Sequence, residues 1–78
     1  MDIKVLGPGC NNCVRLEANA RQALADLGLT ASIEKVTDLP AIIGYGIMST
    51  PGLVVDGMVV SSGRVPSVDD IKRLIARN

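Results

Sequence analysis

The stretch "GPGCNNCVRLEANA", residues 7–20, decides the fold of this chain. It follows the apolar segment "DIKVL" at 2–6, which predicts a short strand broken by glycine and proline. From residue 11 to residue 27, apolar side chains recur at spacings of three and four, which predicts a helix that stops at Gly28. The only two cysteines of the chain therefore lie where a strand passes into a helix.

The predicted helix at 11–27 has one apolar face. We expect that face to contain Cys13, Leu16, Ala20, Ala23 and Leu27. Cys10 falls at the junction of loop and helix, outside this pattern. Cys13 is therefore expected to be the buried thiol and Cys10 the exposed one.

The second half of the chain has clear turn and capping signals. Residues 31–36 predict a second strand, and Asp38 is suited to cap a short helix limited by Gly44 and Gly46. In "GLVVDGMVVSSG" the pair Asp56–Gly57 separates two apolar runs, which predicts a two-residue hairpin turn. A last helix is expected from a Ser67 cap, with an apolar face of Val68, Ile71, Leu74 and Ile75.

The predicted order is strand, helix, strand, helix, hairpin, helix. A helix as long as the first can cross over between parallel strands, whereas the hairpin must be antiparallel. We therefore expect one α/β domain over residues 1–78, with a four-stranded mixed sheet flanked by helices.

Composition excludes several classes of function. Eight acidic residues balance eight basic ones, and Tyr45 is the single aromatic residue, so nucleic-acid recognition by charge or base stacking is not expected. No apolar run is long enough to cross a bilayer, and the first residues do not resemble a signal peptide. We expect no membrane partner and a cytoplasmic location. Met48 and Met58 are interpreted as gap-fillers of the core.

The Cys10–Cys13 pair admits three interpretations. Cytosolic thiols are normally reduced, which favours redox or metal chemistry over a structural disulfide. A disulfide closing so short a loop would stabilise the chain by only about 2 kcal/mol. The start of a helix favours a thiolate through its unpaired N–H groups and positive partial charge, and the thiolate is the attacking species in disulfide exchange. A redox couple is therefore the preferred interpretation, with Cys10 as nucleophile and Cys13 as resolving thiol.

The paired cysteines of "CNNC", the later "STPGLVVDG" and the final helix resemble the thioredoxin fold. The closest resemblance is to its small, glutaredoxin-sized redox-active disulfide proteins. The resemblance covers the whole chain in its βαβαββα element order and implies a three-layer fold. It implies a protein disulfide oxidoreductase without a bound cofactor. Its partners would be disulfide-containing proteins and an electron donor of the thioredoxin-reductase type.

The resemblance also assigns further positions. It matches Thr50–Pro51 to the family's cis-proline loop, which implies a cis bond and contacts to an extended substrate. Where thioredoxins often have a buried acid, this chain has Lys4. Two interpretations of Lys4 stay open: an ammonium that favours the thiolate, or a side chain that reaches solvent from the strand edge.

The main alternative is a domain that handles Cu(I) or another soft metal. Two thiolates suit Cu(I), and small metallochaperones also place CxxC after the first strand. Against it, Pro8 stands where that family has methionine, and the chain is expected to end in a helix rather than a strand. A structural zinc site needs about four ligands, and the chain has two cysteines and no histidine. A non-catalytic adaptor with inert, buried cysteines is the remaining alternative.

Overall fold

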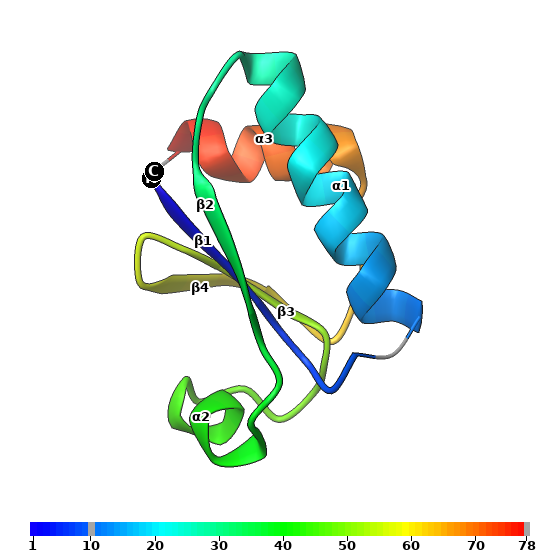
Figure 1. Cartoon of the computed structure of the whole chain (residues 1–78), viewed down its shortest axis with the longest axis vertical. Helices are drawn as coiled ribbons and strands as arrows, with labels where there is room; N and C mark the ends of the chain where they lie inside the picture. Colours follow the sequence, from blue (N-terminus) through cyan, green and yellow to red (C-terminus); the bar gives the residue numbers. More distant parts are fainter. Residues whose placement is uncertain (10, 78) are drawn as a thin grey trace.

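A computed structural model describes residues 1–9 and 11–77. The strands are β1 (Asp2–Leu6), β2 (Ser32–Val36), β3 (Gly52–Val55) and β4 (Met58–Ser62), and the helices are α1 (Asn11–Leu27), α2 (Leu39–Gly44) and α3 (Val68–Arg77). The predicted element order is confirmed. Strand order in the sheet is β2-β1-β3-β4, with β1 and β2 parallel and the other pairs antiparallel. This is the expected four-stranded mixed sheet (Figure 1).

The local signals explain where the elements begin and end. Gly28 has φ 68°, and the N–H groups of Gly28 and Leu29 donate to the carbonyls of Ala25 and Leu24, a Schellman motif that closes α1. The Ala41 N–H donates to the Asp38 carboxylate, which caps α2 as predicted.

The hairpin and the last helix also follow their predicted signals. Asp56 and Gly57 both have positive φ, 49° and 83°, as a two-residue hairpin turn between β3 and β4 requires. The Asp70 N–H donates to the Ser67 hydroxyl over 3.1 Å, so Ser67 caps α3.

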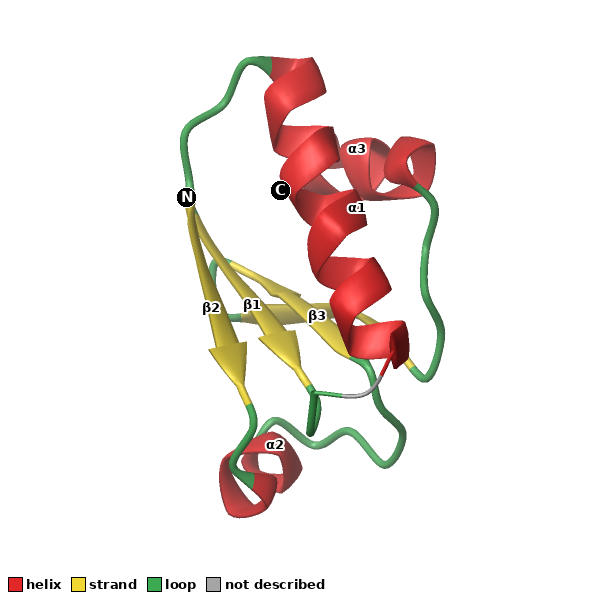
Figure 2. Cartoon of the chain, turned by 45° about the vertical axis from the view of Figure 1, so that its right-hand side comes forward, coloured by secondary structure: helices red, strands yellow, loops and turns green. Residues whose placement is uncertain are grey.

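The sheet separates two apolar clusters because side chains alternate between its faces. On one face, α1 and α3 cover the larger cluster, whereas α2 lies past the ends of β1 and β2 (Figure 2), and its Ile42 packs with the smaller cluster of the other face. The larger cluster contains Ile3, Val5, Leu16, Ala20, Ala23, Leu24, Leu53, Val55, Ile71 and Ile75. The smaller cluster contains Leu6, Ile42 and Val54.

Two details of burial differ from prediction. Leu24 is buried at 5% exposure, whereas Leu27 is 39% exposed. Both residues lie in the last turn of α1, and of the two only Leu24 packs into the larger apolar cluster. The prediction that Met48 and Met58 fill the core is wrong, since their exposures are 100% and 62%. Met48 lies in the loop before Thr50 and Met58 at the start of β4, where neither side chain is enclosed.

Candidate functional site

The first part of the site is the connection between β1 and α1. The Gly7 N–H donates to the Val36 carbonyl over 2.9 Å, so the chain stays beside β2 for one residue after β1 ends. Cys10 lies outside the described residues. Cys13 is the third residue of α1 and is 4% exposed, which agrees with its expected burial on the inner face of that helix.

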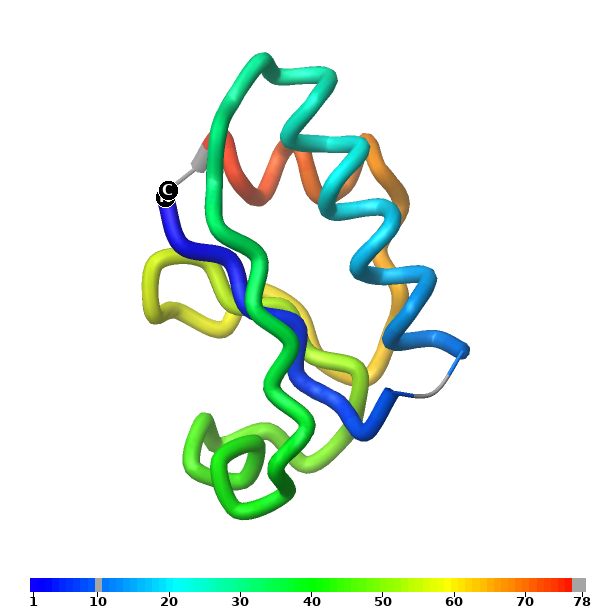
Figure 3. Tube along the Cα trace, in the orientation of Figure 1, coloured from blue at the N-terminus to red at the C-terminus, as the bar shows by residue number. Residues whose placement is uncertain are grey.

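The second part is the loop that leads into β3. The Thr50–Pro51 peptide bond is cis, as the resemblance implied. Thr50 is exposed whereas Pro51 is buried, and the Pro51 carbonyl accepts a hydrogen bond from the Gly63 N–H over 2.9 Å. The next residue, Gly52, pairs with Leu6 at the end of β1. The antiparallel pairing of β1 and β3 thus brings this loop beside the β1–α1 connection (Figure 3).

Gly7 joins the two parts. A Cβ added to Gly7 would overlap the Cys13 Sγ and would lie 3.8 Å from the Thr50 Cβ. The sulfur therefore lies against the backbone of Gly7, and the Thr50 side chain lies close to the same glycine. Two of the predicted site residues, Cys13 and Thr50, are thus brought together from segments far apart in the sequence.

Sequence reasoning treated Gly7 only as a residue that ends a strand. The signal that could have singled out Gly7 is its place just before the turn that carries the cysteines, where the backbone of a residue can lie against a cysteine sulfur. A sequence pattern cannot measure that approach, because it depends on how α1 sits on the sheet.

An apolar groove of about 370 Å³ begins at Thr50 and runs along α2. Leu39 and Ile43 are 62% and 61% exposed, and Met48 is fully exposed. No charged side chain is among its described lining residues, which are Leu39, Ile42, Ile43, Ile47, Met48, Ser49 and Thr50. This surface, the α2 groove, was not predicted from the sequence; of its apolar residues only Met48 was considered, and it was assigned to the core.

Lys4 belongs to the α2 side of the sheet. It alternates along β1 with Ile3 and Val5, whose side chains lie in the cluster under α1 and α3. A side-chain hydrogen bond with Tyr45 raises the pKa of the Lys4 ammonium above its ordinary value of 10.5, and the charges of Tyr45 and Glu34 act in the same direction. Tyr45 is thus the largest influence on the pKa of Lys4, and neither interpretation of the sequence included it.

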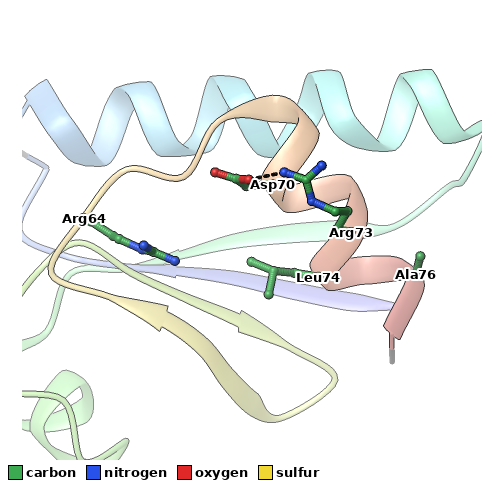
Figure 4. A pocket seen from close by; sticks show the side chains of 5 residues that line it. All are labelled: Arg64, Asp70, Arg73, Leu74 and Ala76. Carbon is green, nitrogen blue, oxygen red and sulfur yellow. Dashed lines mark hydrogen bonds and ion pairs between the residues drawn. The ribbon is translucent and has the colours of Figure 1, made fainter.

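A larger hollow of about 570 Å³ lies beside α3 (Figure 4). Arg64 reaches toward it from the segment after β4, and on α3 the Arg73 guanidinium donates to the Asp70 carboxylate. That bond, with a smaller effect of Ser67, holds the pKa of Asp70 below its ordinary value of 3.8. Neither Cys13 nor Thr50 lines this hollow, so we place the candidate site at the β1–α1 connection instead.

Two further findings concern the described residues alone. Within residues 1–9 and 11–77, no group of three or more cysteines, aspartates and glutamates is arranged to hold a metal ion. Over the same part of the chain, none of the helices combines the length and the apolar character that crossing a bilayer requires.

Comparison with known proteins gives a consistent result. A thioredoxin from Methanothermobacter thermautotrophicus is 42% identical over 76 residues, which cover 97% of this chain and 99% of that protein. A thioredoxin from Methanocaldococcus jannaschii is 39% identical over 70 residues, covering 90% of this chain and 80% of that protein. The thioredoxin domain family matches residues 1–76. With a matching fold and matches of this extent, the chain belongs to the thioredoxin family.

Proposed function

We propose that this protein is a thiol–disulfide oxidoreductase in which Cys10 and Cys13 exchange disulfides with protein clients. Membership of the thioredoxin family supports the general chemistry. The observation that carries the proposal is the position of Cys13, whose sulfur is buried against Gly7 beside the Thr50–Pro51 loop. A buried second thiol in the first turn of a helix, next to an exposed loop, suits intramolecular resolution of a mixed disulfide.

The exchange proceeds in two steps. The Cys10 thiolate attacks one sulfur of the client disulfide, which forms a Cys10–client disulfide and releases the other client sulfur as a thiolate. Cys13, having lost its proton, then attacks the Cys10 sulfur, so that the Cys10–Cys13 disulfide forms and the bond to the client breaks. The client sulfurs take up protons, and two electrons have passed from the protein dithiol to the client disulfide.

The Thr50–Pro51 loop is the proposed contact for the client backbone. Thr50 is exposed and lies close to the Cys13 sulfur across Gly7, which supports a role in holding an extended client segment beside the thiols. The exchange itself needs no bound cofactor. An electron donor of the thioredoxin-reductase type would regenerate the dithiol, and we place the reaction in the cytoplasm, where thiols are kept reduced.

The test is reduction of insulin disulfides with dithiothreitol as electron source, followed by non-reducing gels and mass spectrometry. We expect Cys10→Ser to abolish turnover, since the attacking thiolate is lost. We expect Cys13→Ser to accumulate reductant-sensitive adducts with oxidised clients, because the first step survives and the intramolecular second step does not.

Several outcomes would contradict this proposal. Unchanged turnover in Cys10→Ser would remove the assigned nucleophile, and adducts formed mainly on Cys13 in that variant would reverse the two roles. Stoichiometric Cu(I) binding by the wild type without any disulfide turnover would favour the metal-handling alternative instead.

A further inference from the structure

The space between Gly7 and Cys13 is too small for a side chain. A Cβ at position 7 would overlap the Cys13 Sγ, yet it would lie 3.6 Å from the Cys13 Cβ and 3.8 Å from the Thr50 Cβ. The last two distances are ordinary van der Waals contacts. The conflict therefore involves one atom, the sulfur.

The backbone conformation of Gly7 does not itself demand glycine. Gly9, Gly28, Gly46, Gly57 and Gly63 adopt positive φ, and Gly7 is not among them. Its N–H continues the pairing with β2 through the Val36 carbonyl, as an alanine in its place could also do. The requirement for glycine at position 7 is thus spatial, and the atom that occupies the space is the Cys13 sulfur.

We propose that Gly7 is a positioning residue for Cys13: the missing side chain lets the Cys13 sulfur lie against the end of β1. This inference rests on the proposed function, in which Cys13 is the resolving thiol. A methyl group at position 7 would force Cys13 to rotate about its Cα–Cβ bond, because the Cβ has room and the sulfur does not. The sulfur would leave its buried position, and we expect the proposed second attack to become slower, because that attack depends on where the Cys13 sulfur is held.

The first test measures the position of the sulfur without any redox turnover. In a Cys10→Ser background, Cys13 is the only thiol, and its alkylation by iodoacetamide reports its accessibility. We expect Gly7→Ala to increase the alkylation rate by about tenfold, since the 4% exposed cysteine is pushed outward. Gly44→Ala is the matched control, because Gly44 has no positive φ and nothing within 4 Å of an added Cβ. Equal rates in both variants would overturn the proposal.

A double-mutant cycle identifies the clashing atom. Gly7→Ala is expected to lower the urea midpoint of the chain, whereas in a Cys13→Ala background, where the sulfur is absent, the same change should have little effect. If Gly7→Ala alone fails to fold, Gly7→Ala with Cys13→Ala should still fold. A double variant that stays unfolded, or an equal loss in both backgrounds, would show that Gly7 is needed for another reason.

The functional readout separates this inference from the proposed function. In a chain with both cysteines, Gly7→Ala should accumulate Cys10–client adducts as Cys13→Ser does, while Gly44→Ala should not. If the wild type performs no exchange, the proposed function fails, whereas the alkylation and stability tests still decide whether Gly7 positions the sulfur. Turnover and adduct levels equal to the wild type in Gly7→Ala would overturn the positioning role.

Discussion

The two faces of the sheet are built differently. Under α1 and α3, Ile3, Leu16 and Leu53 are fully buried, and the helices close the face. On the other face, α2 contributes Ile42 to a small cluster but leaves Leu39 and Ile43 mostly exposed. Most of the burial that stabilises the chain therefore lies on the α1–α3 side, and the α2 side keeps apolar surface in solvent.

The open side also adjoins the Thr50–Pro51 loop, because Thr50 is one of the residues that line the α2 groove. Apolar surface left in solvent does not contribute to folding as buried surface does. The two faces therefore differ in how much apolar surface they bury, and we expect them to contribute differently to stability. Three comparisons between variants test this difference.

The largest effect is expected in the closed cluster. Leu16→Ala should lower the free energy of unfolding by about 3 to 5 kcal/mol, because Leu16 is fully buried and its removal leaves a cavity. Ile43→Ala on the open face should change it by less than about 0.5 kcal/mol, since Ile43 is 61% exposed. Urea denaturation of both variants measures the difference. Similar losses would mean that the two faces contribute alike.

An intermediate effect is expected where β3 begins, on the side of the smaller cluster. A Cβ at Gly52 would lie 2.8 Å from the Ile47 Cδ1 and 3.3 Å from the Leu6 Cδ1. Gly52→Ala should therefore lower the free energy of unfolding by about 1 to 3 kcal/mol, because the added methyl group overpacks this site.

Ile47→Val removes the nearest of these atoms, so Gly52→Ala with Ile47→Val should recover part of that loss in urea denaturation. Gly44→Ala, with open space around its Cβ, is again the matched control. If the double variant recovered no stability, the strain would lie in the backbone and not in the contact between the added methyl group and the Ile47 Cδ1.

The smallest effect is expected at the solvent rim of the closed side, where Glu17 on α1 contacts Arg21 and Lys35. The pKa of Glu17 lies below its ordinary value of 4.5, mainly because its carboxylate accepts a hydrogen bond from Arg21. Lys35 on β2 lowers the pKa of Glu17 further. Both cations are about 60% exposed, so the interaction should be worth less than about 1 kcal/mol.

Acid titration measures this effect with the sign worked out. Because the folded-state pKa of Glu17 is lowered, its stabilisation is present above pH 4.5 and is lost as pH falls through the lower, folded value. At neutral pH the free energy of unfolding of the wild type should thus be higher than that of Glu17→Gln. This difference in stability should disappear below pH 4.5 and in high salt. Glu34→Gln, which removes a carboxylate that makes none of these contacts, is the control. If the stability difference between wild type and Glu17→Gln did not change with pH, the Glu17 side chain would contribute by packing and not by its charge.

Short-range signals predicted most of the elements. Gly28 and Asp38 act through hydrogen bonds to residues at most five positions away, and the Asp56–Gly57 turn is recognised by the positive φ of its own two residues, so the sequence alone predicts these features. Burial was predicted less well. Leu24 replaced Leu27 on the buried face, and Met48 is exposed, because burial depends on where a helix ends relative to the sheet and on what covers it.

The sequence by itself determined the order of elements, the hairpin turn, the helix caps and the placement of Cys13 on the inner face of α1. Only the tertiary structure decided that the Cys13 sulfur lies against Gly7, that Thr50 lies close to the same glycine, and that Tyr45 raises the pKa of Lys4 on the α2 side of the sheet. The physical reason is range. Periodicity, caps and turns are set by neighbours in the chain, whereas the space around the Cys13 sulfur depends on how α1 packs on the sheet and on the pairing of β1 with β3, which brings Thr50 to Gly7.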